Sequence, residues 1–387
     1  MIISFWIAVL VIIYSYLGYT LLLFVLSLFY RKRKFTEYTE NEFPEVTLLI
    51  AVYNEKDILE EKIKNSFSLT YPKEKLKHLW ITDGTTDGST EILKSYSQFE
   101  VLHTDQRKGK TAALNRAMNF VKTPYTVFTD ANTMLKPNTI EQLVKHFQDK
   151  RVGCVAGEKK IISTAKDNAA GSGEGLYWNY ESLLKKLEAR VGSVLGAAGE
   201  LYAIQTKLYE APDEKFVLDD FIVSMNIAQK GYKIDYEAKA CAIENASYNI
   251  TEEMKRKVRI AAGGFQVLFS KFSLLNFTKH FMLSFQYLSH KVLRWFLVPF
   301  AFVFLFIINV LIVVQTGEFN LYAILFILQL IFYLVALLGG IYQKQILGFK
   351  VLFLPFYICV MNYSIIKGFV RFLTGKQKAA WEKAHRN

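Results

Sequence analysis

Polar side chains that could hold a ligand follow several short apolar runs of the sequence, at the points where those runs end. Asp130 and Asn132 stand two positions apart after "YTVFT" (125–129), and Asp83 follows "HLWIT" (78–82). Residues i and i+2 of an extended chain point to the same side, so Asp130 and Asn132 would project together. Either the acid and the amide hold a ligand or they begin the next helix.

The runs that carry these side chains alternate with helical patterns. Continuous apolar runs of strand type are "VTLLIAV", "HLWIT", "FEVLH", "YTVFT" and "VGCVAG", and helices are expected between them. This alternation predicts an α/β domain with a mostly parallel sheet. Ligands of such sheets bind beyond the carboxyl ends of the strands, where Tyr53, Glu55, Asp83, Asp130 and Asn132 fall.

Two phosphate-binding motifs are missing from the sequence. No G-x-G-x-x-G follows the first apolar run, and G-x-x-x-x-G-K-[ST] does not occur. Dinucleotide-binding and P-loop functions therefore lose their usual support. A bound phosphate would have to be met by a metal ion or by basic side chains.

The two ends of the chain are apolar enough for a membrane. Residues 1–29 contain no charged side chain and exceed the roughly 20 residues that span a bilayer. A cleaved signal peptide is the alternative, but its positive charge would precede the apolar run. Here the basic residues 31–34 follow it, which predicts an anchor with the N-terminus outside and the middle of the chain in the cytoplasm.

Three further apolar stretches lie at residues 293–314, 321–342 and 349–373. The basic segment 343–350 and the basic tail 374–387 are both expected in the cytoplasm. Four complete spans would instead leave both chain ends outside, so we expect one segment not to cross. The weakest is the last, which contains a proline, an asparagine, a lysine and an arginine and could re-enter or lie in the interface.

Charge and cysteine content fit a membrane protein of a reducing compartment. The net charge is +12, and basic residues cluster beside apolar segments, as attraction to anionic lipid headgroups would favour. We find no signature of nucleic-acid binding. The three cysteines are scattered and odd in number, so no disulfide framework is expected.

Several motifs, in order along the chain, resemble those of membrane-integrated family 2 glycosyltransferases, such as the cellulose, chitin, hyaluronan and poly-N-acetylglucosamine synthases. They are "AVYNE", "TDGTTDGST", "RKGKTAALN", "TDANT" and "VLDDF". The resemblance implies a GT-A fold, a Rossmann-like, mostly parallel sheet in the cytoplasm, with helical transmembrane segments. The expected divisions are an anchor (1–30), the GT-A domain (45–250), an amphipathic interfacial junction (251–292), membrane segments (293–373) and a basic cytoplasmic tail (374–387).

The resemblance assigns the nucleotide-sugar donor to the first three motifs. Tyr53 would stack near the base, Glu55 would contact the nucleoside, and Asp83 would accept a hydrogen bond from the base. Lys110 would approach the diphosphate. A helix start, capped by Asn54, is the alternative for the first motif.

The "TDANT" segment corresponds to the D-x-D motif of the family, with Asn132 in place of the second aspartate. Asp130 and Asn132 would then bind Mg²⁺ or Mn²⁺, which accept carboxylate, carbonyl and water oxygens. Such a metal neutralises charge that develops on a departing nucleoside diphosphate. The amide removes one negative charge from the site.

The "VLDDF" segment matches the one that carries the catalytic base. The second acid of the pair is the base in the family, which indicates Asp220, with Asp219 in support. A carboxylate near an acceptor hydroxyl can take its proton as transfer proceeds. Capping of the following helix is the alternative role.

"KRKVRIAAGGFQ" (255–266) stands where the family has Q-x-x-R-W. Arg259 matches the arginine, which would bind the diphosphate. Arg256 replaces the glutamine and Ile260 the tryptophan, which puts long-chain synthesis in doubt. Trp178 could supply the aromatic contact to an acceptor, although packing in the core is an alternative for it, and Arg256 is a second candidate for the acceptor site.

We therefore expect an inverting, metal-dependent hexosyltransferase at the plasma or inner membrane, with its site in the cytoplasm. It would use a nucleotide sugar, with UDP as the expected nucleotide, to extend a polysaccharide or glycan. One alternative is a transferase that adds a single sugar to a lipid-linked acceptor. A transporter with a regulatory soluble domain is a remote alternative, because the acids lie outside the apolar segments.

Overall fold

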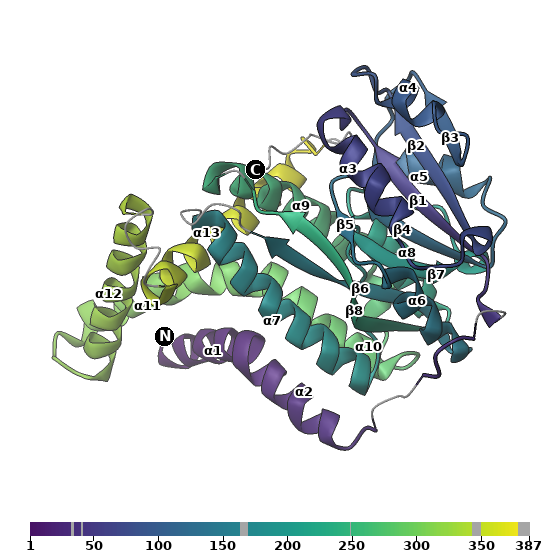
Figure 1. Cartoon of the computed structure of the whole chain (residues 1–387). Coiled ribbons are helices and arrows are strands. Elements are labelled where there is room, and N and C mark those ends of the chain that lie inside the picture. The colour runs from purple at the N-terminus through teal and green to yellow at the C-terminus, as the bar shows by residue number, and fades with distance from the viewer. Residues whose placement is uncertain (32–34, 40–41, 163–168, 248, 343–349, 378–387) are drawn as a thin grey trace.

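The structure, a computed structural model, describes the chain except residues 32–34, 40–41, 163–168, 248, 343–349 and 378–387. An α/β domain occupies one side of the molecule and long apolar helices occupy the other (Figure 1). Most of the basic residues expected after the anchor, between the last two apolar stretches and in the tail lie outside the described residues.

Eight strands form one sheet in the described part of the chain, in the order β3-β2-β1-β4-β7-β6-β8-β5. They are β1 (Val46–Val52), β2 (Leu76–Asp83), β3 (Phe99–Thr104), β4 (Tyr125–Asp130), β5 (Met134–Leu135), β6 (Val152–Ile162), β7 (Leu201–Gln205) and β8 (Lys233–Asn245). Strand β7 runs antiparallel to both neighbours, and β5 pairs antiparallel with β8. The other pairs are parallel, which confirms the predicted mostly parallel sheet.

Helices cover both faces of this sheet because its central strands are apolar on both sides. All seven residues of β1 are buried. Helices α3 (Lys56–Phe67), α4 (Ser89–Lys94) and α6 (Thr139–Val144) pack on one face. Helices α5 (Lys110–Met118), α8 (Asp219–Gln229) and α9 (Ile250–Ser270) pack on the other.

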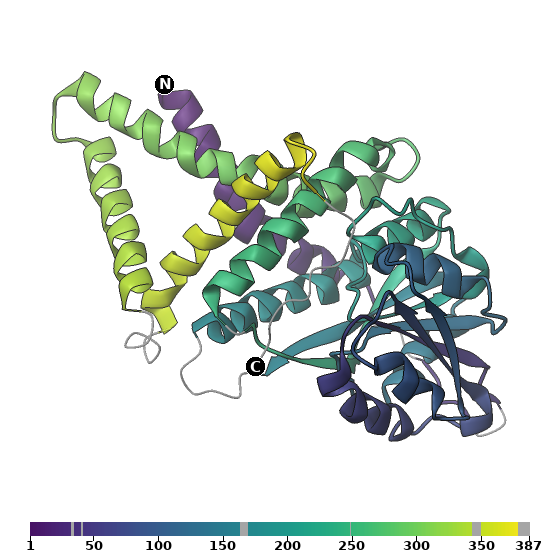
Figure 2. The same ribbon diagram turned by 90° about the horizontal axis from the view of Figure 1, so that it is seen from above.

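Among the described residues, four helices are long and apolar enough to cross a membrane: Ile2–Leu28, Phe281–Thr316, Leu321–Ile341 and Phe353–Leu373. The second begins inside the segment that was expected to be interfacial, with α10 (Phe281–Gln286) and a π-helical stretch, η7 (Tyr287–Leu297), continuing into α11 (Val298–Thr316). Helices α11 and α12 (Leu321–Ile341) extend away from the α/β domain, and α13 (Lys350–Leu373) returns to pack against α9 (Figure 2). Which of the four crosses a membrane stays a prediction.

The N-terminal helices are α1 (Ile2–Ile13) and α2 (Tyr19–Leu28). Buried polar contacts join α2 to helix α7 (Ala169–Val191), and join α7 to η7. Tyr19 donates a hydrogen bond to Glu188 Oε1 at 2.9 Å, and His290 Nδ1 lies 2.7 Å from the same oxygen. Arg294 Nη1 donates to Glu181 Oε1 at 2.8 Å. Buried charges are tolerated only when they are paired, so these contacts fix α2, α7 and η7 relative to one another.

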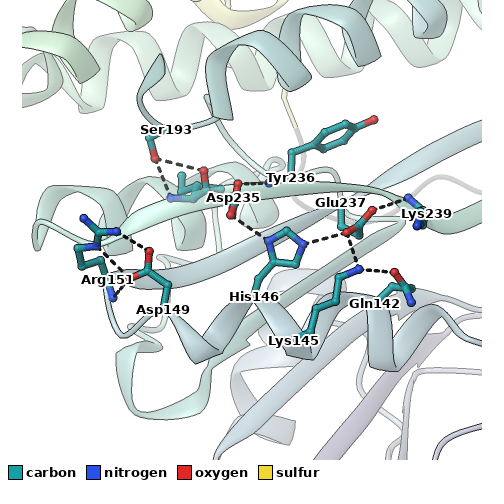
Figure 3. A network of polar contacts seen from close by, with 11 residues as sticks. Gln142, Lys145, His146, Asp149, Arg151, Ser193, Asp235, Tyr236, Glu237 and Lys239 are labelled. Atoms are coloured by element: carbon teal, nitrogen blue, oxygen red, sulfur yellow. Dashed lines mark hydrogen bonds and ion pairs between the residues drawn. The ribbon is translucent and has the colours of Figure 1, made fainter. Parts of the chain in front are cut away.

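A second polar network lies at the start of β8, away from the carboxyl ends of the central strands (Figure 3). His146 follows α6 and is buried between two carboxylates of β8: its Nδ1 is 2.9 Å from Asp235 Oδ2 and its Nε2 is 3.0 Å from Glu237 Oε2. Burial opposes the charged imidazolium, but the hydrogen bonds and charges of the two carboxylates outweigh it and raise the pKa of His146. Lys145 Nζ lies 3.0 Å from Glu237 and adds to this network.

The raised pKa predicts a pH-dependent contribution to stability. Folded His146 binds its proton more tightly than the unfolded chain does, so the contribution is complete below pH 6.5 and is lost as pH rises through the raised pKa. We expect His146→Gln to cost about 1.5–3 kcal/mol in the acidic range and less in the alkaline range. Thermal unfolding in detergent from about pH 6 to about pH 9 tests this, with His280→Gln as a control. If the free energy of unfolding lost in His146→Gln does not become smaller as pH rises, the raised pKa of His146 is wrong.

Candidate active site

Parallel strands bring the predicted site residues to one edge of the sheet. In the register of β1 and β4, Ala51 pairs with Asp130, and in the register of β1 and β2, Val52 pairs with Thr82. Asp130 is the last residue of β4 and Asp83 the last of β2, while Tyr53 follows β1 directly. The edge therefore gathers side chains from three separate motifs, as the sequence predicted.

The carboxylate of Asp83 organises the loop before α5. Its Oδ2 accepts hydrogen bonds from the backbone N–H of Lys108 at 3.0 Å and of Gly109 at 2.6 Å, and Arg116 Nη1 lies 3.3 Å from its Oδ1. Gly84 has φ +65°, and a Cβ there would lie 2.7 Å from Arg107 Cβ, so only glycine fits this approach. The predicted contact of Asp83 with a base remains a prediction.

The loop that Asp83 holds presents a cation to Tyr53. The guanidinium carbon of Arg107 lies 3.9 Å from the centre of the Tyr53 ring. The neighbouring Glu55 is buried and is the residue before α3. The capping role of Asn54 is wrong, because its Oδ1 accepts a hydrogen bond from Thr86 N at 2.9 Å and its φ is +51°.

Lys110 lies among three carboxylates. Its Nζ donates a hydrogen bond to Asp130 Oδ1. Burial opposes its positive charge, but the negative charges of Asp130, Asp219 and Asp220 outweigh burial and raise the pKa of Lys110. The structure thus brings the third, fourth and fifth motifs together around one ammonium group.

Asp219 and Asp220 are the first residues of α8, so neither is its N-cap, which is Leu218. Asp220 Oδ1 nevertheless accepts a hydrogen bond from the backbone N–H of Phe221 at 2.8 Å, in the first turn of the helix. Burial, helped by the charges of Asp219 and Glu200, raises the pKa of Asp220 to about 7, although the nearby charge of Lys110 acts in the opposite direction. Burial also raises the pKa of Asp219. A carboxyl that titrates near neutral pH is suited to accept a proton from a hydroxyl.

The loop after β4 carries side-chain oxygen atoms that could bind a divalent cation. Asp130 attracts an ammonium group here, and Asn132 Nδ2 donates to Glu244 Oε1 at 3.2 Å. The amide oxygen of Asn132 accepts a hydrogen bond from Thr133 Oγ1 at 3.4 Å, and its second lone pair could bind a cation. No group of three or more acidic, histidine or cysteine side chains with a metal-binding arrangement occurs among the described residues. An oxygen pair fits Mg²⁺ or Mn²⁺, which keep water and substrate phosphate as their other ligands.

The sequence interpretation missed a buried lysine behind this loop. Lys62 of α3 is fully buried and donates to the carbonyl oxygen of Thr133 and, at 3.4 Å, to Thr129 Oγ1. Burial lowers the pKa of Lys62 to about 7, although Asp130 acts against this shift. Its position one turn after Leu59, on the apolar side of α3, was the only signal in the sequence.

A second missed lysine, Lys159 of β6, lies between two carboxylates. Its Nζ donates a hydrogen bond to Glu200 Oε1 and lies 2.5 Å from Glu244 Oε2. The same ammonium lies 4.9 Å from the centre of the Trp178 ring, and Lys185 lies 5.5 Å from it. Two ammonium groups thus approach the ring that was predicted to contact an acceptor, and that role stays a prediction.

The two arginines predicted on α9 have different surroundings. Arg256 Nη1 lies 2.8 Å from Glu174 Oε1 and 3.5 Å from Glu253 Oε2, so acids of α7 and α9 hold it. The charge of Arg259 acts on Asp219 and opposes the rise in its pKa, which puts Arg259 on the side of the site.

Family models match most of this architecture. A model of glycosyl transferase family 2 matches residues 47–196, and a model of glycosyl transferase family group 2 matches residues 125–338, more than half of the chain. The chain is a family 2 glycosyltransferase. It is therefore an enzyme, and the predicted resemblance is confirmed.

Individual relatives of this glycosyltransferase agree with the family. A poly-beta-1,6-N-acetyl-D-glucosamine synthase of Staphylococcus aureus is 26% identical over 282 residues, which cover 70% of this chain and 67% of that protein. The corresponding synthase of Staphylococcus epidermidis is 24% identical over 238 residues, 59% of this chain and 56% of that one.

A solved structure supports the fold. The mannosyltransferase PcManGT from Pyrobaculum calidifontis, in complex with GDP-Man and Mn²⁺, superposes with a TM-score of 0.67 at 18% identity. The match covers 96% of this chain and 99% of that one. This likeness confirms the predicted GT-A fold of the α/β domain, and the match extends over the apolar helices as well.

Gly199 lies beside both charged partners of the site. A Cβ on Gly199 would be 3.2 Å from Lys110 Nζ and 3.3 Å from Asp220 Oδ2. Both distances are tighter than ordinary van der Waals contact, so the backbone of Gly199 lines the space between these two side chains. An added methyl group there would force one of these side chains to shift by a few tenths of an ångström.

We expect Gly199→Ala to lower kcat by up to about 10-fold, because a displacement of ~1 Å costs on the order of 10²-fold and the shift forced here is only a few tenths of an ångström. Release of nucleoside diphosphate from the preferred donor measures the effect. Gly175→Ala is the matched control, because a Cβ at Gly175 meets no atom within 4 Å. Equal activities of the two variants would show that Gly199 does not border the reacting groups.

Proposed function

We propose that this glycosyltransferase is an inverting, metal-dependent enzyme that uses a UDP-sugar to extend a polysaccharide or glycan at the membrane, with its site in the cytoplasm. The observation that carries the proposal is the carboxyl of Asp220, whose pKa is raised to about 7 beside the Lys110–Asp130 ion pair. This arrangement places a candidate base next to an ammonium group that could meet the leaving diphosphate. The printed names of the Staphylococcus relatives make UDP-N-acetylglucosamine the first donor to test.

In this proposal Asp220 takes the proton of the acceptor hydroxyl as the hydroxyl oxygen attacks the anomeric carbon. A single displacement needs only this one base, and it inverts the configuration at that carbon. Asp219 is buried beside Asp220, and its charge helps to raise the pKa of Asp220. The raised pKa keeps Asp220 basic enough to accept a proton near neutral pH.

The other charged groups act on the leaving group. Lys110 and Arg259 carry positive charge toward the acids of the site and would meet the diphosphate of the donor. Asp130 and Asn132 would hold a divalent cation, which supplies charge neutralisation for the departing nucleoside diphosphate. Tyr53 and Asp83, at the ends of β1 and β2, would contact the nucleoside.

A second candidate function is transfer of one sugar to a lipid-linked acceptor. It is favoured by Ile260, which stands where the synthases of this family carry a tryptophan, and by Arg256, which is paired with Glu174. The transporter alternative has no support, because the chain belongs to a family of transferases.

A donor screen tests the proposal directly. We expect detergent-purified protein with Mn²⁺ or Mg²⁺ to release nucleoside diphosphate from one of UDP-glucose, UDP-galactose, UDP-N-acetylglucosamine, UDP-glucuronate and GDP-mannose. Chelation by EDTA and the change Asp220→Asn should each remove this activity, the latter by about 10²- to 10⁴-fold. Asp213→Asn is the matched control, because Asp213 forms an exposed ion pair with Lys215. Release that survives Asp220→Asn would refute the assigned base.

The pKa of Asp220 also predicts a pH profile. The base must be deprotonated, so kcat/KM for the donor should rise with pH and level off above about 7. Below that pH we expect a fall of about tenfold per pH unit. A profile that is flat between about pH 5 and about pH 7 would exclude Asp220 as the titrating base.

A further inference from the structure

Lys159 pairs with two carboxylates, one near Asn132 and one near Asp220. Its ammonium is buried between Glu244 of β8 and Glu200, the residue before β7. Glu244 also accepts the hydrogen bond of Asn132, so its orientation is fixed from the metal-binding loop. A buried lysine is tolerated only with such partners, and Lys159 thereby holds the carboxylate of Glu200 in place.

Glu200 is the accessible member of this group. Its side chain is 15% exposed, whereas those of Lys159 and Glu244 are 1% exposed. It directly follows Gly199, whose backbone lies against Asp220. Thr129 Oγ1 donates to the carbonyl oxygen of Glu200 at 2.9 Å, which anchors the turn. A carboxylate is thus held beside the base and in reach of solvent.

The charge of this region favours one class of acceptor. Asp219, Asp220 and Glu200 add negative charge on the side of the base. The cations nearby are already engaged or assigned to the donor. Lys159 is paired with Glu200 and Glu244, and Arg256 with Glu174 and Glu253. Lys110, which is paired with Asp130, and Arg259 would meet the diphosphate of the donor in the proposed function. A phosphate that approached Asp220 would meet carboxylates, whereas a sugar hydroxyl can donate hydrogen bonds to them.

We propose that Glu200 binds the acceptor by accepting a hydrogen bond from a hydroxyl of its terminal sugar, and that the acceptor is an uncharged glycan and not a lipid phosphate. The inference rests on the proposed function and names the acceptor class of the same site. Glu200 contacts the acceptor, while Lys159 is a positioning residue that acts through Glu200.

The test compares Glu200→Gln, Glu200→Ala and Glu200→Asp with wild type and with Glu210→Gln, a control at an exposed ion pair with Lys230. The probes are β-linked oligosaccharides of glucose, galactose and N-acetylglucosamine, and undecaprenyl phosphate. Binding is measured in the presence of nucleoside diphosphate by calorimetry, and transfer is measured with the preferred donor. Affinity for the nucleoside diphosphate reports whether the donor site is intact.

We expect one oligosaccharide to bind, and its Kd and KM to rise about 10- to 100-fold in Glu200→Ala and Glu200→Gln, as for loss of a hydrogen bond to a charged group. Glu200→Asp should recover part of the loss, with affinity for the nucleoside diphosphate little changed. Equal Kd in wild type and variants, binding of undecaprenyl phosphate alone, or binding of no probe would overturn the inference. Binding that depends on Glu200 without any transfer by wild type would count against the proposed function and not against the acceptor site.

Discussion

The site depends on two lysines that lie among carboxylates: Lys159, which is buried, and Lys110, which is partly exposed. Lys110 and Lys159 together neutralise much of the charge of Asp130, Glu200 and Glu244. Removing one partner of a buried ion pair typically costs about 3–5 kcal/mol, because the other charge is left uncompensated. So many carboxylates close together need positive charge to be stable. For the same reason the site would attract a divalent cation that accompanies a nucleotide sugar. Burial, helped by the charges of Asp219 and Glu200, raises the pKa of Asp220 into the range of a general base.

Helix α9 extends this arrangement toward the apolar helices. Arg259 acts on Asp219 at the site, while two residues later Ala261 packs against α13, where a Cβ on Gly368 would lie only 2.5 Å from Ala261 Cβ. The two helices therefore touch almost backbone to backbone. The buried contacts of Glu181 and Glu188 with η7 and α2 fix α7 in the same way. Helices α7 and α9 thus carry charged side chains of the α/β domain, and they also contact the apolar helices.

The order of motifs along the chain was enough to predict which residues meet, because the parallel strands β1, β2 and β4 end at one edge. Tyr53, Asp83 and Asp130 come together for this reason, although their distances could not be derived. Lys110 and Asp220 join Asp130 from the first turns of α5 and α8, which only the family resemblance indicated. The helix cap was predicted wrongly, because Asn54 binds Thr86 of a distant loop. Lys62, Lys159, Glu200 and Glu244 were missed for the same reason: their partners lie on other strands and helices, and a lysine in an apolar segment gives no sign of its partner.

The hydrogen bonds and ion pairs of this network explain why position 132 carries an amide and not a carboxylate. Asn132 Nδ2 donates to Glu244 Oε1 at 3.2 Å, and Glu244 in turn pairs with Lys159. An aspartate at position 132 would place a second carboxylate against Glu244 without a proton between them, and like charges at this distance repel strongly. The negative charge that this chain lacks at Asn132 is therefore present on β8, at Glu244. Lys159 pairs with both Glu244 and Glu200. One ammonium group therefore orients a carboxylate beside Asn132 and another beside Asp220.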